Sequence, residues 1–447
     1  MSKFSFKDIC EYIKPVNMPD KFKAAYDKWN GEGHVVGEKE MDDILVRYAI
    51  TGEQSDKLHG YLQRIQADEK ICDYIKFLTW TQCDIRRYDY FLDCDHNLNG
   101  GALGDLGETL EFFMLLSCIA FARTDLESRM IPKELYEQIP YRMLDEIMER
   151  YKELGTLRIL DIPWKLNFFS LSIYLFDRFL FVPCKFDDPY YFYRGEDGDV
   201  IGVAMGGLNI DDMGQLIPDD EELSDPNGVK NGHYYGRFSE KRKTAFTTTF
   251  RETDTEILGS RISPCGTVTT KTVILSKGKY KKILERDDWM IGFHIPSGEG
   301  YTPQRVRNSM TLAWKFFERY YPEIPFKGFW SSSWLYDGRL STLLPEDSRI
   351  VRVQRQFFNY TGGWNGESTY LELFGDVEQP LSEVPQESSL QRNLAKCLLD
   401  GKKFIDTGMV YFPEELKKDY NKPIYITDED LREQDELYTR TGWKGGT

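Results

Sequence analysis

Residues 289–302, WMIGFHIPSGEGYT, decide the fold of the second half of this chain. An apolar run ends at His294, and a loop with two glycines, residues 297–300, follows it. Thr302 and Pro303 then supply a preferred N-cap and a preferred first helical residue. A strand, a glycine loop and a helix N-terminus in this order form a pocket for anions, because the first N–H groups of a helix have no partner within it. The sequence therefore predicts an anion-binding loop.

The helix that follows this loop carries an apolar face and an unusual charge pattern. Apolar residues recur at helical spacing, at Val306, Met310, Ala313, Phe317 and Tyr320. Arg305 and Arg307 lie in the first turns, where the positive end of the helix dipole favours acidic side chains. A bound anion beside Gly298 and Gly300 would explain these arginines. The alternative is that both are solvated or pair with acids elsewhere in the chain.

The residues after the helix predict further alternation of strands and helices. We expect a strand, a short helix and two more strands at residues 328–335, 338–344, 349–358 and 369–374. A connection as long as the helix after the loop requires a parallel pairing of the first two strands, and the final pair is expected to be antiparallel.

Several side chains near the strand ends are candidates for chemistry or binding. His294 ends the first strand and can act as a base near neutral pH, or it can be a structural hydrogen-bonded histidine. On the second strand, Ser332 and Trp334 are predicted to share one face. That face either lines a substrate groove or packs against a helix. Arg355 falls among apolar residues, where a charge must find a partner.

The second half of the chain resembles the GNAT superfamily of acyl-CoA-dependent acyltransferases. More narrowly, the sequence resembles a bacterial acyltransferase family that has a helical N-terminal domain and a GNAT-like C-terminal domain. The resemblance is carried by residues 292–298, 316–317, 333–335, 344–345, 347–348, 350–351, 354–355, 389–391 and 398.

The resemblance implies roles for the loop and the strand ends. In such enzymes the loop binds the CoA pyrophosphate through backbone N–H groups, which here would be those of Ser297, Gly298 and Gly300, with Arg305 and Arg307 nearby. The position that usually holds Gln or Arg holds Ile295.

The reaction would also need an acid and a base. Tyr336, near the end of the second strand, is the implied general acid, and His294 is the candidate base. Glu299 is a third catalytic candidate. Its carboxylate would repel the pyrophosphate, so it either turns outward or binds the acceptor. Ser332, Trp334 and Arg355 are the expected substrate-binding residues.

Composition limits the possible partners. The chain has 447 residues and a formal net charge of -16, which argues against nucleic acids and anionic membranes as main partners. A CoA site in so acidic a protein needs locally basic residues. The eight cysteines are scattered without a paired metal spacing, and the N-terminus has no apolar signal core. We expect a cytoplasmic protein with acyl-CoA as co-substrate and no metal.

The domain organisation is predicted to be α+β. Helical spacing dominates residues 1–165, with Pro140 expected to split one helix. Residues 166–447 are expected to form the mixed α/β GNAT-like domain with a C-terminal extension. Its β-rich segment, about residues 190–280, supplies either the early strands of the GNAT-like sheet or a separate subdomain.

A partial calcium-loop pattern lies between two of the predicted helices. Residues 95–100 read D-x-N-x-N-G, but Leu106 occupies the twelfth position, where a bidentate glutamate is needed. A glycine-rich turn is the better interpretation.

The sequence supports two classes of function. The first is an acyltransferase that passes an acyl group from CoA to an unknown amine or hydroxyl acceptor. The second is a non-catalytic protein that binds a small molecule or a carbohydrate on a degenerate GNAT-like scaffold, and the many Trp and Tyr residues fit an aromatic-lined sugar site.

Overall fold

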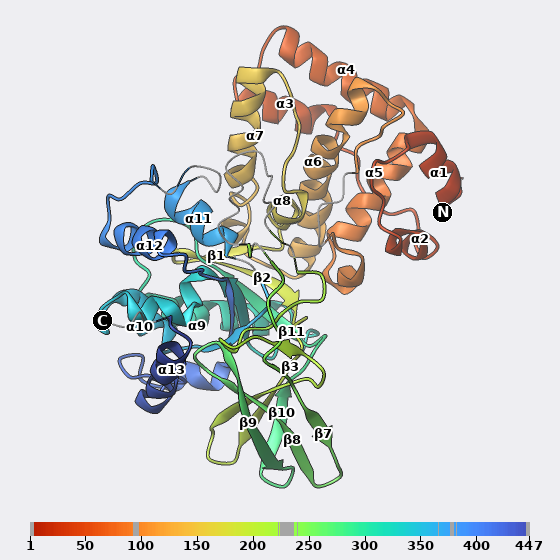
Figure 1. Ribbon diagram of the computed structural model, residues 1–447. Helices are drawn as coiled ribbons and strands as arrows, with labels where there is room; N and C mark the ends of the chain where they lie inside the picture. Colours follow the sequence, from red (N-terminus) through yellow and green to blue (C-terminus); the bar gives the residue numbers. More distant parts are fainter. Residues whose placement is uncertain are drawn as a thin grey trace. The chain divides into compact units, whose positions relative to one another are not determined.

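The protein is described here by a computed structural model (Figure 1). It describes residues 4–92, 98–221, 223, 237–238, 240–364, 366–375, 380 and 382–443. Residues 95–97 of the calcium-like turn and most of the acidic segment after Pro218 lie outside these residues. The chain divides into two compact units, Met1–Leu175 and Phe176–Thr447. The first is helical and the second combines sheets with helices, which confirms the α+β prediction.

The first unit is built around a long buried helix, α6 (Asp105–Ser128). Helices α4 (Glu53–Ala67) and α5 (Glu69–Gln82) are separated at Asp68, whose side chain accepts hydrogen bonds from the N–H groups of Lys70 and Ile71 and caps α5. Pro140 immediately precedes α7 (Tyr141–Leu154), as predicted. The other helical segments are α1 (Phe6–Ile13), α2 (Lys21–Tyr26), α3 (Glu38–Arg47), η1 (Ile85–Tyr90), η2 (Lys133–Leu135) and α8 (Ile162–Phe169).

The central sheet of the second unit has the strand order β2-β11-β12-β14-β13. These strands are β2 (Phe179–Lys185), β11 (Trp289–His294), β12 (Phe329–Ser333), β14 (Thr407–Tyr411) and β13 (Phe358–Thr361). Strands β11 and β12 are parallel, as predicted, and the other neighbours are antiparallel. Helix α9 (Pro303–Tyr320) connects the parallel pair and packs on one sheet face through Trp314 and Phe329, whose ring centroids are 6.0 Å apart. Strand β1 (Tyr174–Phe176) spans the boundary between the two units.

Strands β11 and β12 separate toward their C-terminal ends. Only Ile291 with Phe329 and Gly292 with Trp330 are paired between them. Strand β12 nevertheless pairs with β14 along its whole length. The last two residues of β11 and the last three of β12 therefore border a gap in the sheet.

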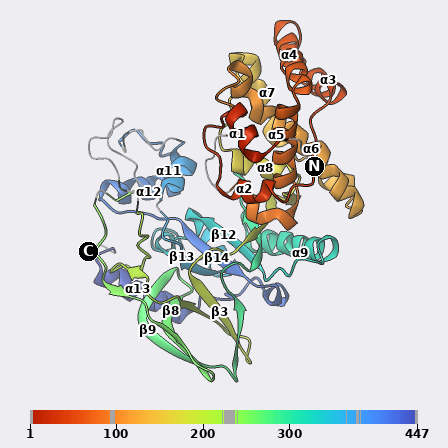
Figure 2. The same cartoon turned by 90° about the vertical axis from the view of Figure 1, so that its right-hand side faces the viewer.

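The β-rich segment forms a separate sheet, which resolves the alternative left open by the sequence. Its order is β10-β3-β4-β8-β7, and β9 also pairs with β8. In Figures 1 and 2 this sheet extends away from the central one within the second unit. The strands are β3 (Tyr190–Gly195), β4 (Val200–Ala204), β7 (Phe250–Glu252), β8 (Glu256–Ser263), β9 (Thr267–Ser276) and β10 (Tyr280–Leu284), and a small pair is formed by β5 (Asn209–Ile210) and β6 (Phe246–Thr247).

Two predicted strands are helices in the structure. Residues 349–358 begin as α10 (Arg349–Gln354), because the Ser348 hydroxyl accepts a hydrogen bond from the N–H of Val351 and caps the helix. Residues 369–374 belong to α11 (Glu367–Phe374), which buries Tyr370 and Phe374 on one helical face. The expected antiparallel pairing of these two segments is therefore wrong.

The segments around these helices correct the sequence prediction in detail. The predicted strand over 328–335 ends at Ser333 and continues as η3 (Trp334–Tyr336) and η4 (Gly338–Thr342). Helix α12 (Ser389–Leu399) is capped by the Ser388 hydroxyl, which accepts a hydrogen bond from the N–H of Gln391. The C-terminal segment contains η5 (Pro413–Lys417) and α13 (Asp428–Arg440), and Tyr438 of α13 is buried against Leu340 in an apolar cluster.

A buried carboxylate ties the two sheets of the second unit together. Asp188 accepts hydrogen bonds from the Tyr360 hydroxyl at 2.5 Å and the Trp330 indole N–H at 3.0 Å. Burial raises the pKa of Asp188 to about 6. Its segment leads into β3, whereas Tyr360 lies on β13 and Trp330 on β12.

Replacing Asp188 by alanine should lower the free energy of unfolding by about 2–4 kcal/mol, because two donors lose their acceptor. Asp187→Ala is the matched control, since that exposed carboxylate only pairs with Arg286 at the surface and should change stability by less than about 0.5 kcal/mol. Denaturant unfolding of both variants measures the difference. Equal losses would show that Asp188 does not hold the sheets together.

Candidate active site

The loop between β11 and α9 has the form that the sequence predicts. Strand β11 ends at His294, and the Thr302 hydroxyl caps α9 by accepting a hydrogen bond from the N–H of Arg305 at 3.3 Å. Gly298 and Gly300 have φ angles of 109° and 95°, which residues with a side chain rarely adopt. The two glycines therefore permit the curled path of the loop.

Arg178 holds this loop from the side. It lies in the turn between β1 and β2, and its guanidinium donates hydrogen bonds to the backbone carbonyls of Pro296, Gly298 and Glu299. The bond to Gly298 is 2.9 Å long. Three carbonyls of one short loop are thereby turned toward the same cation.

The hydrogen bonds from Arg178 to these carbonyls also fix the direction of the backbone N–H groups in the loop. In a planar trans peptide the C=O and the following N–H point in opposite directions. The N–H groups of Ser297, Glu299 and Gly300 therefore point away from Arg178, just before the N-terminus of α9. Among the described residues, no group accepts a hydrogen bond from them. Such donors at a helix N-terminus suit an anion.

The two arginines of α9 have different surroundings. Arg305 pairs with Asp177, with Nε and Oδ2 2.7 Å apart, and so fits the alternative in which it meets an acid of the chain. Arg307 donates to the carbonyl of Leu416 at 2.7 Å and lies over the ring of Tyr420. That both arginines serve the loop stays a prediction, and Nε of Arg307 is meanwhile engaged by the C-terminal segment.

The strand ends beside the gap present different groups on the two sheet faces. The register of β11 and β12 puts His294 and Ser332 on one face, and Phe293 and Ser331 on the other, with α9. The buried Tyr336 hydroxyl donates to Ser331 at 3.1 Å, next to the hydroxyl of Tyr301. The shared face predicted for Ser332 and Trp334 is wrong, because the chain leaves the strand at Ser333 and turns into η3, which carries Trp334 and Tyr336.

Burial sets the protonation of these groups. It lowers the pKa of His294 to about 4, so the imidazole is neutral at pH 7. It raises the pKa of Tyr336 above its ordinary value, so the phenol keeps its proton. The Glu299 side chain is exposed to solvent.

Two predicted substrate-binding residues have structural surroundings instead. Trp334 is on η3 and packs against the apolar cluster of Leu340 and Tyr370. Arg355 follows α10, where it donates to Glu346 at 2.9 Å and Asp428 at 2.5 Å. The expectation that Arg355 finds partners is confirmed, and those partners occupy the guanidinium that was predicted to bind substrate.

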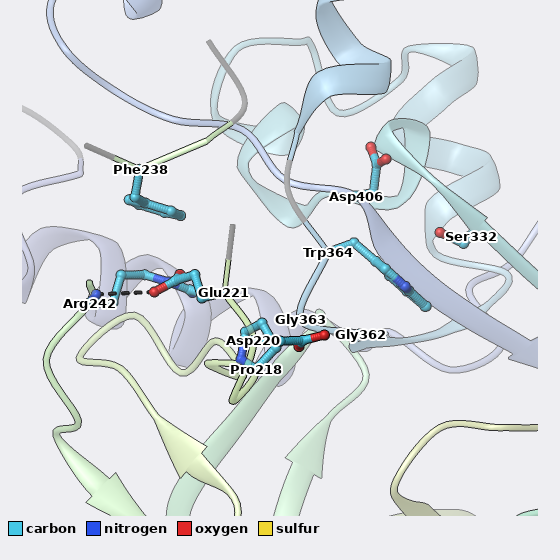
Figure 3. A pocket seen from close by; sticks show the side chains of 10 residues that line it. All are labelled: Pro218, Asp220, Glu221, Phe238, Arg242, Ser332, Gly362, Gly363, Trp364 and Asp406. Atoms are coloured by element: carbon cyan, nitrogen blue, oxygen red, sulfur yellow. Dashed lines mark hydrogen bonds and ion pairs between the residues drawn. The ribbon is translucent and has the colours of Figure 1, made fainter. Parts of the chain in front are cut away.

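A cavity of about 510 Å³ lies on the face of the central sheet that carries Ser332 (Figure 3). Of the predicted site residues, Ser332 alone is among its described lining residues, which are Pro218, Asp220, Glu221, Phe238, Arg242, Ser332, Gly362, Gly363, Trp364 and Asp406. Sequence reasoning missed Asp406 and Trp364, and it also missed Arg178. The one local signal was the polar pair Asp177-Arg178 inside an aromatic stretch.

The described part of the chain contains no group of three or more His, Cys, Asp or Glu side chains placed to hold a metal ion. None of its helices is long and apolar enough to cross a membrane.

Comparison with known proteins agrees with this geometry. Residues 234–410 match the family model of the GNAT-like C-terminal domain. The crystal structure of an acyltransferase in complex with decanoyl-CoA is 14% identical, covers 92% of this chain and 100% of its own, and has a TM-score of 0.51, which shows a shared fold. An acyltransferase in complex with decanoyl-CoA and teicoplanin is 15% identical, with coverages of 91% and 98% and a TM-score of 0.48. No curated protein matches the chain.

The lowered pKa of His294 predicts a pH-dependent loss of stability. Because the folded value lies below the unfolded one, the unfolded state binds more protons between about pH 6.5 and pH 4, and this contribution to stability is lost as pH falls. From pH 7 to pH 4.5 the wild type should lose on the order of 1–2 kcal/mol more than His294→Asn. Denaturant unfolding at both pH values measures this, and parallel losses would show that His294 is not desolvated.

Proposed function

We propose that the protein is an acyltransferase that uses acyl-CoA and passes the acyl group to an amine or hydroxyl acceptor. The observation that carries the proposal is the set of outward N–H groups at Ser297, Glu299 and Gly300 beside the opening between β11 and β12. The pyrophosphate of CoA would accept hydrogen bonds from these groups, and the acyl thioester would lie in the gap. The acyltransferase of the same fold whose structure holds decanoyl-CoA supports this choice.

The groups around the gap fit the needs of acyl transfer. Neutral His294, on one face, would take the proton from the acceptor as its nitrogen or oxygen attacks the thioester carbonyl carbon. The C–S bond then breaks, and Tyr336, reached from the other face, would supply the proton that converts the thiolate into the thiol. Both side chains return to their starting states by exchange with solvent. Arg178 supplies local positive charge of the kind that an acidic protein needs beside CoA.

Two substitutions that differ only in charge test whether the loop binds the CoA pyrophosphate. Ser297 is exposed and precedes the two glycines, so a longer side chain fits without a clash. Ser297→Glu should weaken the binding of decanoyl-CoA at least tenfold, because a carboxylate would compete with the pyrophosphate for the same donors. Ser297→Gln has nearly the same shape and should stay within about threefold. Calorimetric titration measures both.

Two results would contradict the proposal. One is the failure of folded wild-type protein to bind any acyl-CoA. The other is equal weakening by Glu and Gln, which would place the nucleotide elsewhere. Decanoyl-pantetheine, which lacks the pyrophosphate, should bind the wild type and Ser297→Glu equally.

His294→Gln tests the chemical step separately. This variant should bind decanoyl-CoA like the wild type and lower the rate of acyl transfer by about 100-fold, since the base is lost while the loop is intact. Release of the CoA thiol in the presence of a panel of amines and alcohols reports the rate. Unchanged transfer would remove His294 from the mechanism.

A further inference from the structure

The cavity on the Ser332 face has aromatic walls and an excess of negative charge. In Figure 3, Asp406, Ser332 and Trp364 lie on one side, and Phe238 with the Arg242–Glu221 pair lies on the other. Its volume of about 510 Å³ falls in the range of sites that enclose a small molecule.

The only cation among the described lining residues is already neutralised. Arg242 donates to Glu221 through Nε at 2.5 Å and to Asp211 through Nη1 at 2.9 Å. Its other terminal nitrogen donates to the carbonyl of Leu216. Asp220 and Asp406 therefore remain without a compensating cation among the described lining residues.

Asp406 is held in place by a hydrogen bond. It immediately precedes β14, and its carboxylate accepts a hydrogen bond from the Ser368 hydroxyl at 2.5 Å. Burial, with Asp337 and Glu367 nearby, raises its pKa to about 7. Among the described residues no Lys or Arg pairs with it. A carboxylate in this state is stabilised by an entering cation and can also accept a proton near neutral pH.

Ser332 connects the cavity to the gap between the strands. It lies two residues beyond Trp330, the last residue of β12 that pairs with β11, and it shares a sheet face with His294. The rings of Trp330 and Trp364 are 6.5 Å apart and nearly perpendicular, so the wall of the cavity is packed on the same strand. A molecule in the cavity would face the gap from the side of His294.

We infer that this cavity binds the acyl acceptor, and that the acceptor is a primary amine attached to a flat ring. Its ammonium group would pair with Asp406 while its ring lies against Trp364, because aromatic faces favour rings and cations. This inference rests on the proposed acyltransferase function.

The pairing also prepares the amine for reaction. Asp406 takes one proton from the ammonium group, which leaves a neutral amine with a free electron pair. The nitrogen attacks the thioester carbonyl carbon, the second proton passes to His294, the C–S bond breaks, and Tyr336 protonates the departing CoA thiolate. Overall the ammonium and the thioester give an amide, the CoA thiol and one proton released to solvent.

Binding of two closely matched probes tests the inference without acyl transfer. Tryptamine carries the ring and the amine, and tryptophol replaces the amine by a hydroxyl. Calorimetry should show tryptamine binding to the wild-type protein at least tenfold more tightly than tryptophol. Asp406→Asn should weaken tryptamine about tenfold or more and leave tryptophol within twofold. Asp400→Asn, an exposed carboxylate at the end of α12, is the control and should change neither.

The outcomes separate this inference from the proposed function. Equal affinities for the two probes, or a tryptamine affinity that survives Asp406→Asn, would overturn it even when decanoyl-CoA binds normally. Retained, Asp406-dependent tryptamine binding without any acyl-CoA binding would instead overturn the acyltransferase proposal. Trp364→Leu provides a second variant should Asp406→Asn fold poorly, and it should weaken both probes.

Discussion

The guanidinium of Arg178 determines how the loop between β11 and α9 presents its backbone. It gathers three carbonyls of residues 296–299 on one side, and the planarity of the peptide then places the intervening N–H groups on the other. Its neighbour Asp177 pairs with Arg305 of α9. Asp177 and Arg178, two consecutive residues of one turn, thus hold both the loop and α9. The direction of the backbone N–H groups in the loop depends on that turn.

The gap between β11 and β12 explains why the candidate groups lie on two faces of one sheet. Alternation along each strand sends His294 and Ser332 one way and Ser331 the other. In an unbroken sheet such groups could not meet one molecule. Where the strands separate, a thioester in the gap can be reached from both sides, and the cavity beside Ser332 then lies on the side where an acceptor must approach.

The parts of this structure that sequence could predict depend on local signals. Sequence could predict the end of β11, the two glycines and the Thr302 cap, because each of these features depends only on residues close to it in the sequence. Residues 349–358 were misread because Ile350, Val351 and Val353 favour a strand, whereas the cap at Ser348 decides for a helix. Arg178 and Asp406 could not be found, because their roles come from chain segments far away. Arg178 is 120 residues from Gly298, and the described lining of the cavity of Asp406 comes from five separate stretches of the chain.

A site made from backbone donors has a consequence for how such proteins change over evolution. Every residue except proline carries the same N–H group, so the loop can exchange most of its side chains and keep its donors. Only the two glycines, whose φ angles are positive, and the arginine that turns the carbonyls are constrained by chemistry. Ile295, which stands where the superfamily pattern usually has Gln or Arg, falls at a position free to vary. Relatives of this kind can diverge until no linear motif remains while the geometry of the loop persists.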